Sequence, residues 1–202
     1  MNTLCAWLLV GLGLPVVTLR GRRMALGAVT VQALVVVALA VHHASGPQEV
    51  VAAAALGVRA LALAALFLVL AARTRDPRPV GAGAGPARRG ALAVGLALLL
   101  VWLVPSAGLA SRTVEGVVLS CVAFGLLVAA TTRSTVFQVL GIVLVENGLA
   151  LAALDLPGTS WLIELGVAFD LTLIALVAGV FHERIFAEFG AGDTSALATL
   201  RD

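Results

Sequence analysis

Long apolar runs separated by short polar connections dominate the chain, and they predict a bundle of membrane-spanning helices. A helix needs about 20 mostly apolar residues to cross a hydrocarbon core about 30 Å thick. Alternation with a period of two residues is not sustained, so a transmembrane β-barrel is not expected, and helices are the other architecture that lipid permits. We therefore predict an all-α integral membrane protein with about seven transmembrane helices, near residues 3–19, 24–45, 49–72, 90–107, 114–132, 135–154 and 160–182.

One connection is longer than the others and divides the expected helices into two groups. Residues 73–90 read RTRDPRPVGAGAGPARRG, and this Arg, Pro and Gly content is typical of a flexible linker. We expect a three-helix half over residues 1–72 and a four-helix half over residues 91–202. The first apolar run lacks a basic n-region and a small-residue cleavage site, so we expect it to be retained as a span and not removed as a signal peptide.

The composition agrees with a membrane protein and excludes other classes. The 202 residues are 61% hydrophobic and 12% charged, whereas soluble domains average roughly 45–50% apolar and about 25% charged residues. A chain of this length has too little interior to bury so much apolar surface in water. All 13 basic residues are arginines and the net charge is only +2, so no nucleic-acid partner is expected. Cys5 and Cys121 lie in different apolar runs, and no spacing typical of a metal or redox cofactor site occurs.

The placement of the arginines predicts how the chain crosses the membrane, because connections on the cytoplasmic side carry an excess of positive charge. Arg112 is the one arginine expected on the opposite side, and Arg59 lies inside a span. We therefore expect the N-terminus outside and the C-terminus in the cytoplasm. The arginines of the cytoplasmic side are then Arg20, Arg22, Arg23, Arg73, Arg75, Arg78, Arg88, Arg89, Arg133, Arg184 and Arg201.

Four ionisable residues stand out inside expected spans, where charge is costly and usually functional: Arg59, Glu146, Glu164 and Asp170. Counting at about 1.5 Å of helix rise per residue places Arg59, Glu146 and Asp170 each about 14–15 Å from the outer end of its span. This depth is close to the middle of the bilayer. Glu164 lies closer to the outer edge. We therefore expect a layer of three charged residues from three different spans.

The turn around Pro157 and Gly158 is short, so the last two spans are expected to form an antiparallel hairpin that brings Glu146 and Asp170 to the same level. Two neighbouring carboxylates in a low dielectric cannot both be ionised cheaply. One of them is therefore expected to bind and release protons at cellular pH, with Arg59 holding the other ionised. Two alternatives remain open at this point: the charges fasten the helices together, or they bind a cation or a substrate.

Three amide side chains also lie within expected spans. Gln32 and Gln138 are expected to form hydrogen bonds between helices. Asn147 is either a local partner of Glu146 or a site that holds water.

The C-terminal third carries a set of motifs that extends beyond hydrophobic patterning. They are Gly141, Glu146-Asn147-Gly148, Glu164-Leu165-Gly166 with Asp170, and the tail from Asp193 to Leu200-Arg201-Asp202; Gln32 and Arg59 fit the same pattern. With these motifs the chain resembles the component E family of hydrogenase-4 and formate-hydrogenlyase-type membrane complexes.

The resemblance implies a fold and partners that the residues alone do not indicate. Residues 134–202 are similar to the K subunit of complex I and to the C subunit of Mrp antiporters. Such subunits lie beside antiporter-like membrane subunits in complexes whose redox chemistry is carried out by a cytoplasmic module. They contribute to the proton path, have no catalytic activity of their own and hold no cofactor. A multi-pass protein of the bacterial cytoplasmic membrane follows as an expectation.

Three positions depart from the pattern of these relatives. Val143 stands where the K subunit has a glutamate in its second helix, so Glu146 is displaced by one turn. Asp170 stands in place of a glutamate, and Arg59 stands where a lysine is expected in the component E family. Arginine stays protonated in proteins, so Arg59 can tune its neighbours but is not expected to relay a proton.

The leading hypothesis is a non-redox membrane-arm subunit of a complex-I-like or hydrogenase-type complex that contributes to proton or sodium translocation. Its proton path would use Glu146, Asp170 and Asn147, tuned by Arg59, with Glu164 near the outer exit. A purely structural membrane anchor of such a complex is one alternative. A stand-alone small transporter is the other, although the inverted repeats or broken spans frequent in that class are not visible.

Overall fold

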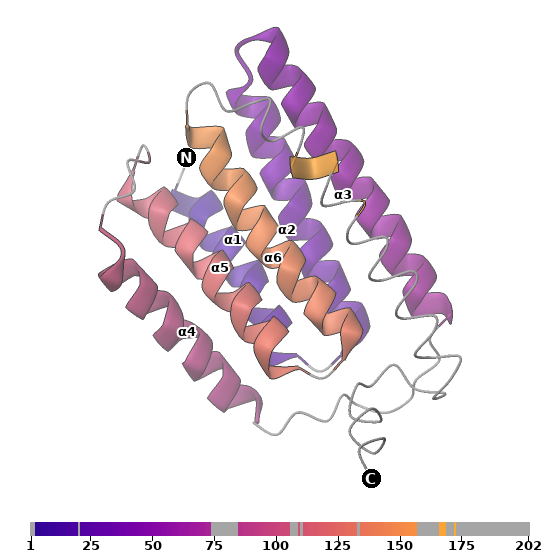
Figure 1. Ribbon diagram of the computed structural model, residues 1–202, viewed down its shortest axis with the longest axis vertical. Coiled ribbons are helices and arrows are strands. Elements are labelled where there is room, and N and C mark those ends of the chain that lie inside the picture. The colour runs from indigo at the N-terminus through magenta and orange to yellow at the C-terminus, as the bar shows by residue number, and fades with distance from the viewer. Residues whose placement is uncertain are drawn as a thin grey trace.

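The computed structural model is a bundle of long helices (Figure 1). It describes residues 3–19, 21–73, 85–105, 109, 111–132, 134–156, 166–168 and 172. Six helices are complete within these ranges: α1 (Thr3–Thr18), α2 (Arg22–His43), α3 (Pro47–Arg73), α4 (Pro86–Leu103), α5 (Arg112–Thr131) and α6 (Thr135–Asp155).

Five of these helices, α2 to α6, are long and apolar enough to cross a membrane. The apolar part of α1 is shorter and runs from Cys5 to Thr18. The all-α, multi-pass membrane class predicted from the sequence is therefore supported by the helices that are described. The seventh expected span, 160–182, lies outside the described residues except for the helical residues 166–168 and Thr172.

The boundaries of α4 differ from the sequence prediction. The span was expected over residues 90–107, but the helix runs from Pro86 to Leu103. Proline is favoured in the first turn of a helix, where its missing N–H would have no partner. At the other end, Pro105 disfavours a helical conformation of the residue before it, and α4 stops two residues ahead of this proline. The last residues of the predicted linker therefore belong to α4, and Arg89 is buried in the bundle.

The helices α5 and α6 form an antiparallel hairpin in the middle of the bundle (Figure 1). Glycines allow their backbones to approach closely: a Cβ atom at Gly141 would lie 2.6 Å from the backbone oxygen of Gly125, and one at Gly148 would lie 3.0 Å from the Cβ of Cys121. Small residues at helix interfaces are the usual means of tight packing in membranes. Gly141 and Gly148 therefore allow α5 and α6 to pack closely.

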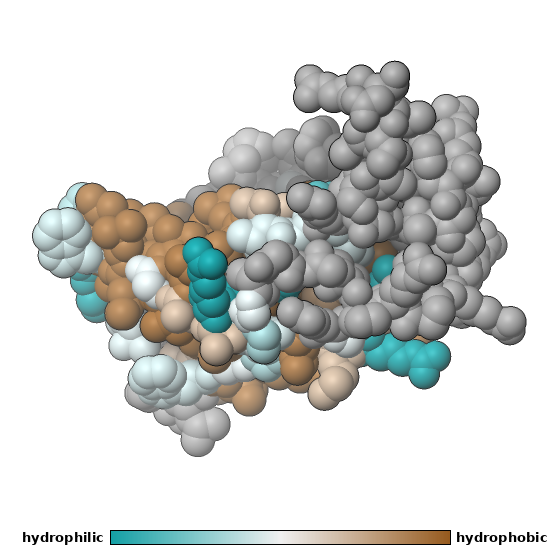
Figure 2. Space-filling model, turned by 90° about the horizontal axis from the view of Figure 1, so that it is seen from below, coloured by the Kyte–Doolittle hydropathy of each residue, from teal (hydrophilic) through white to brown (hydrophobic). Residues whose placement is uncertain are grey.

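The other described helices lie behind this hairpin and to its two sides (Figure 1). The helices α1 and α2 pack against it and against each other, while α3 packs along α2 and α4 packs against α5 and α1 at the opposite edge (Figure 1). Large apolar side chains remain exposed on the outside, and Trp7 and Trp102 are 72% and 79% exposed. Figure 2 views the bundle from one end and shows apolar residues over much of its described surface. Such a surface suits contact with lipid or with other membrane helices, not with water.

The core of the bundle consists of two apolar clusters, one towards each end. The Phe124 cluster includes Phe124, Phe137, Leu140 and Leu144. The Leu56 cluster includes Ala40, Ala53, Leu56, Val117 and Leu151. The buried polar residues of the candidate site lie at the boundary between the two clusters.

Candidate functional site

An ion pair links α3 to α6 in the interior of the bundle. Arg59 of α3 donates a hydrogen bond from Nη2 to Oε2 of Glu146 on α6. The two residues are only 4% and 9% exposed. Charges removed from water to this extent require a partner, because removing one of them leaves the other uncompensated at high cost. Two of the three charged residues that the depth count placed in one layer are therefore in direct contact.

A second polar pair lies beside the first and links α2 to α6. Asn147 donates from Nδ2 to Oε1 of Gln32 over 3.1 Å. The amide nitrogen of Gln32 in turn donates to the backbone oxygen of Leu9 on α1 over 2.9 Å and lies 3.6 Å from the Sγ of Cys121 on α5. Gln32 is fully buried and joins three other helices, which confirms the interhelical role expected from the sequence.

The four residues Gln32, Arg59, Glu146 and Asn147 form what we call the polar layer. On each helix that contributes to the polar layer, the nearest cluster member on one side belongs to one apolar cluster and the nearest on the other side belongs to the other cluster. The flanking buried residues are Val29 and Val36 around Gln32, Leu56 and Leu63 around Arg59, and Leu144 and Ala150 around Glu146 and Asn147. The layer therefore crosses the bundle between two apolar slabs, as residues at one depth of a membrane would.

A small cavity adjoins the polar layer between α2, α3 and α6. Arg59 and Asn147 line it together with the apolar side chains Ala33, Val36, Val37, Leu56, Ala60 and Leu63. The space open to the centre of a water molecule is about 10 Å³, close to the minimum that one water requires. The buried Nε of Arg59 has no hydrogen-bond partner among the described residues. The polar layer thus contains one buried donor, the Nε of Arg59, that has no hydrogen-bond partner among the described residues, and a cavity beside it.

Two other predicted site residues lie outside the described part of the chain. Glu164 and Asp170 lie outside the described residues of the expected seventh span, and with them the second carboxylate of the predicted layer. The described part of this segment is helical, and Val167 is buried in the Leu56 cluster. Asn147 bonds to Gln32 on another helix; the sequence offered its neighbour Glu146, or water, as its partner.

Gln138 has a different role from Gln32. Its Nε2 donates to the backbone oxygen of Thr132, 3.2 Å away, at the end of α5. This bond ties the first turn of α6 to the end of the preceding helix. Gln138 therefore stabilises the α5–α6 turn and not the polar layer.

One buried carboxylate was missed by the sequence reading. Glu115, in the first turn of α5, is buried and accepts a hydrogen bond from Nη1 of Arg112 over 2.7 Å. The Arg112 side chain itself is 57% exposed. An acidic residue three positions after an arginine on a helix is a recognisable pairing signal. It could have indicated the pair, although not the burial of Glu115.

The chemistry of the polar layer is restricted by its residue types. Amides do not titrate at cellular pH and arginine stays protonated, so Glu146 is the titratable group of the layer. A proton added to Glu146 would remove the charge that compensates Arg59 in an apolar interior. Protonation of Glu146 must therefore be coupled to a change around Arg59. Within the described ranges, no group of three or more His, Cys, Asp and Glu residues could hold a metal ion.

Comparisons with known proteins add no family assignment to this geometry. No protein-family model, no curated protein and no solved structure matches the chain.

Proposed function

We propose that the chain is a non-redox membrane-arm subunit of a complex-I-like or membrane-bound hydrogenase-type complex, and that its polar layer takes part in proton or sodium translocation. The observation that carries this proposal is the buried Arg59–Glu146 ion pair between two apolar slabs. Intramembrane charges that are retained at such cost are typical of ion pathways.

The sequence supports the proposal independently of this pair. The Glu146-Asn147-Gly148 and Glu164-Leu165-Gly166 motifs with Asp170 resemble those of the component E family. The proposal includes seven spans, with the N-terminus outside and the C-terminus in the cytoplasm, on the basis of the arginine distribution. In this arrangement Asp170 adds a second carboxylate to the layer, and Glu164 lies near the outer exit.

The proton step would involve Glu146 as the group that changes charge. An adjacent antiporter-like subunit that alters the surroundings of Arg59 would change how strongly Glu146 holds its proton. The 10 Å³ cavity beside Arg59 is suited to one water. Such a water would extend the layer from the ion pair towards Asn147.

A structural anchor is the second candidate, and one observation favours it. The helix α3 packs along α2, and in the described part of the chain the Arg59–Glu146 pair joins its side chains to α6. A pair in this position can fasten α3 to the bundle without moving a proton.

Purification of the tagged chain from its native membrane in mild detergent tests the general proposal. We expect antiporter-like membrane subunits and a cytoplasmic redox module to copurify. A chain that is stable alone and transports a solute in liposomes would contradict the proposal.

Glu146→Gln separates the two candidates, because it keeps the shape of the side chain and removes its titration. We expect the complex to assemble but to couple redox turnover to the ion gradient less well in proteoliposomes. Glu115→Gln is the matched control, since Glu115 is also a buried carboxylate paired with an arginine but lies outside the polar layer. If Glu146→Gln pumps like the parent while Arg59→Ala disassembles the complex, the pair is structural.

A further inference from the structure

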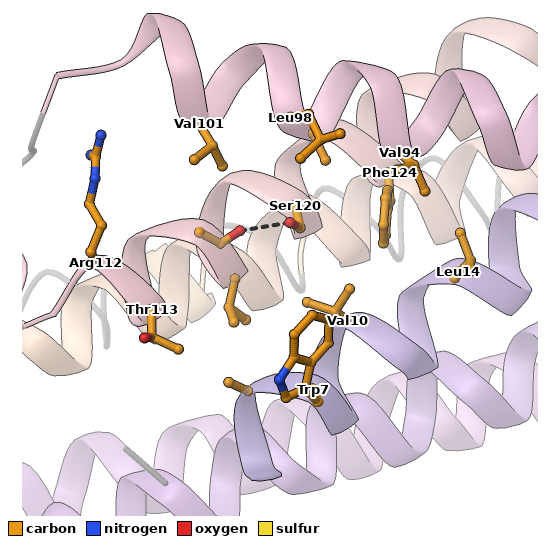
Figure 3. A pocket seen from close by; sticks show the side chains of 14 residues that line it. Trp7, Val10, Leu14, Val94, Leu98, Val101, Arg112, Thr113, Ser120 and Phe124 are labelled. Carbon is orange, nitrogen blue, oxygen red and sulfur yellow. Dashed lines mark hydrogen bonds between the residues drawn. The ribbon is translucent and has the colours of Figure 1, made fainter. Parts of the chain in front are cut away.

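A groove lies between α1, α4 and α5, away from the polar layer (Figure 3). Its volume is about 590 Å³, within the range of small-molecule sites. Its walls are almost wholly apolar and include Val10 and Leu14 of α1, Leu98 and Val101 of α4, and Val117 and Phe124 of α5. Ser120 also lines it, but its hydroxyl donates to the backbone oxygen of Gly116 over 2.7 Å and is not free to bind a ligand as a donor.

The groove closes at one end because α4 packs tightly there. A Cβ atom at Gly90 would lie 3.2 Å from Cγ2 of Thr18 on α1, and Ala93 is fully buried. Further along, α4 and α5 leave space: a Cβ atom at Gly116, which lines the groove, would meet no atom within 4 Å. The open part is therefore a hollow between well-packed helices and not a gap in the core.

The polar groups of the groove gather at the other end, where α5 begins. Arg112 and Thr113 lie there, and their side chains are seen at the mouth in Figure 3. The guanidinium of Arg112 carries five N–H donors, of which Glu115 takes one in the described part of the chain. The exposed remainder can bind an oxyanion, for which arginine is well suited.

The dimensions of the groove match one leaflet of a bilayer. From Arg112 to Phe124 the groove follows α5 for 12 residues, or about 18 Å of helix rise. Half of a hydrocarbon core about 30 Å thick is about 15 Å. A molecule with a charged head at Arg112 and an apolar tail ending near Phe124 would therefore extend from the membrane surface to the midplane.

A thin, extended molecule suits the groove. The 590 Å³ is the space open to the centre of a water molecule, and spread over about 18 Å it gives a mean cross-section of about 33 Å². An extended hydrocarbon chain is thin enough to lie along this space. A helix of a partner protein is about 10 Å across with its side chains and is the alternative that a cross-linking measurement tests.

We propose that this groove binds one acyl chain of a phospholipid from the leaflet at the α5 N-terminal end, and that the lipid phosphate binds Arg112. Two of its walls, α4 and α5, are long and apolar enough to cross a membrane, so the bilayer is the source of such a chain. The bound lipid fills the space between α4 and the α1–α5 face. It thereby fastens α4, the span with the smallest share of buried residues, to the rest of the bundle.

Native mass spectrometry of the full-length protein, purified in mild detergent, tests the proposal. The parent should retain one phospholipid, and Gly116→Leu, whose Cβ would meet no atom within 4 Å and whose side chain would occupy the groove, should lower the lipid occupancy about tenfold, a factor equivalent to about 1.4 kcal/mol. Gly95→Leu is the matched control: a Cβ there also meets no atom within 4 Å, and Gly95 is exposed on α4 and lies outside the groove lining. It should retain the lipid like the parent.

The head group is tested with the double variant Arg112→Gln, Glu115→Gln, which removes the phosphate partner without leaving a buried carboxylate unpaired. It should also lower lipid occupancy. Retention of the lipid by Gly116→Leu at the parental level would overturn the proposal. So would the identification of the bound molecule as an isoprenoid quinone or another compound without phosphate.

A second measurement on the unaltered protein does not depend on the folding of any variant. In proteoliposomes that contain chain-labelled phosphatidylglycerol, the electron paramagnetic resonance spectrum should show an immobilised component for about one lipid per protein. If no immobilised component is present, the groove does not hold a lipid. If a cysteine at Val101 instead cross-links to a partner subunit in the assembled complex, the groove is a protein interface and the proposal fails.

Discussion

Arg59 on α3 binds Glu146 on α6, at the boundary between the Phe124 cluster and the Leu56 cluster. The residues are 87 positions apart in the sequence. The next residue of α6, Asn147, faces α2 and binds Gln32. Two successive residues of one helix therefore connect it to two different neighbours, and the stability of the bundle should depend on both connections.

Removing one partner of the Arg59–Glu146 pair should lower the free energy of unfolding more than replacing both partners. Arg59→Ala leaves Glu146 without the arginine charge and should lower the free energy of unfolding by about 3–5 kcal/mol. The double variant Arg59→Met, Glu146→Leu replaces both charges by apolar side chains and should be less destabilised than Arg59→Ala alone. Unfolding of the purified protein in mixed micelles with increasing denaturant measures both values. If the double variant is destabilised as much as Arg59→Ala or more, the buried charge of Glu146 is not what makes Arg59→Ala costly, and the prediction is wrong.

The hydrogen bond between Asn147 and Gln32 should show the same pattern, with smaller changes in the free energy of unfolding. Gln32→Leu leaves the buried amide nitrogen of Asn147 without its acceptor, and a buried polar group without a partner costs about 1–3 kcal/mol. The double variant Gln32→Leu, Asn147→Leu should recover part of this loss in the same unfolding measurement. Gln138→Leu serves as a comparison, because this partly buried residue has one bond to the Thr132 backbone. It should cost no more than about 1.5 kcal/mol.

The glycine contact between α5 and α6 should tolerate no side chain. A Cβ atom at Gly141 would lie 2.6 Å from the Gly125 backbone oxygen, so even Gly141→Ala must push the two helices apart. Overpacking of this kind costs about 1–3 kcal/mol. Gly27→Ala is the control, since a Cβ there meets no atom within 4 Å. It should be neutral or stabilise α2 by up to about 1 kcal/mol through helix propensity. Thermal unfolding monitored by circular dichroism compares the two variants, and equal melting temperatures would contradict the tight contact.

The proposed orientation predicts which connections a membrane-impermeant maleimide reaches. In a background with Cys5 and Cys121 replaced by alanine, a cysteine at Gly46 should be labelled on intact cells. A cysteine at Val80 should be labelled only after the cells are made permeable, because the arginine-rich connection is proposed to face the cytoplasm. Labelling of position 80 on intact cells would reverse the orientation.

The sequence by itself determined the helical membrane class of the protein and the common level of Arg59 and Glu146. Unpaired backbone groups are too costly in lipid, so long apolar runs must become helices. Their boundaries follow from local chemistry, as Pro86 and Pro105 do for α4. Because the rise per residue of a helix is constant, the number of residues from the end of each span is enough to place Arg59 and Glu146 at one level.

The tertiary structure alone decided which residues face one another. Depth says nothing about the direction in which a side chain leaves its helix or about which helices are neighbours, because both depend on packing around the whole bundle. The pairing of Asn147 with Gln32, the burial of Glu115 and the groove beside α4 all depend on these directions. Close glycine contacts set the α5–α6 axis. That axis in turn places Glu146 against α3 and Asn147 against α2. Counting residues along the sequence gives the level of each side chain but not the neighbouring helix that it faces.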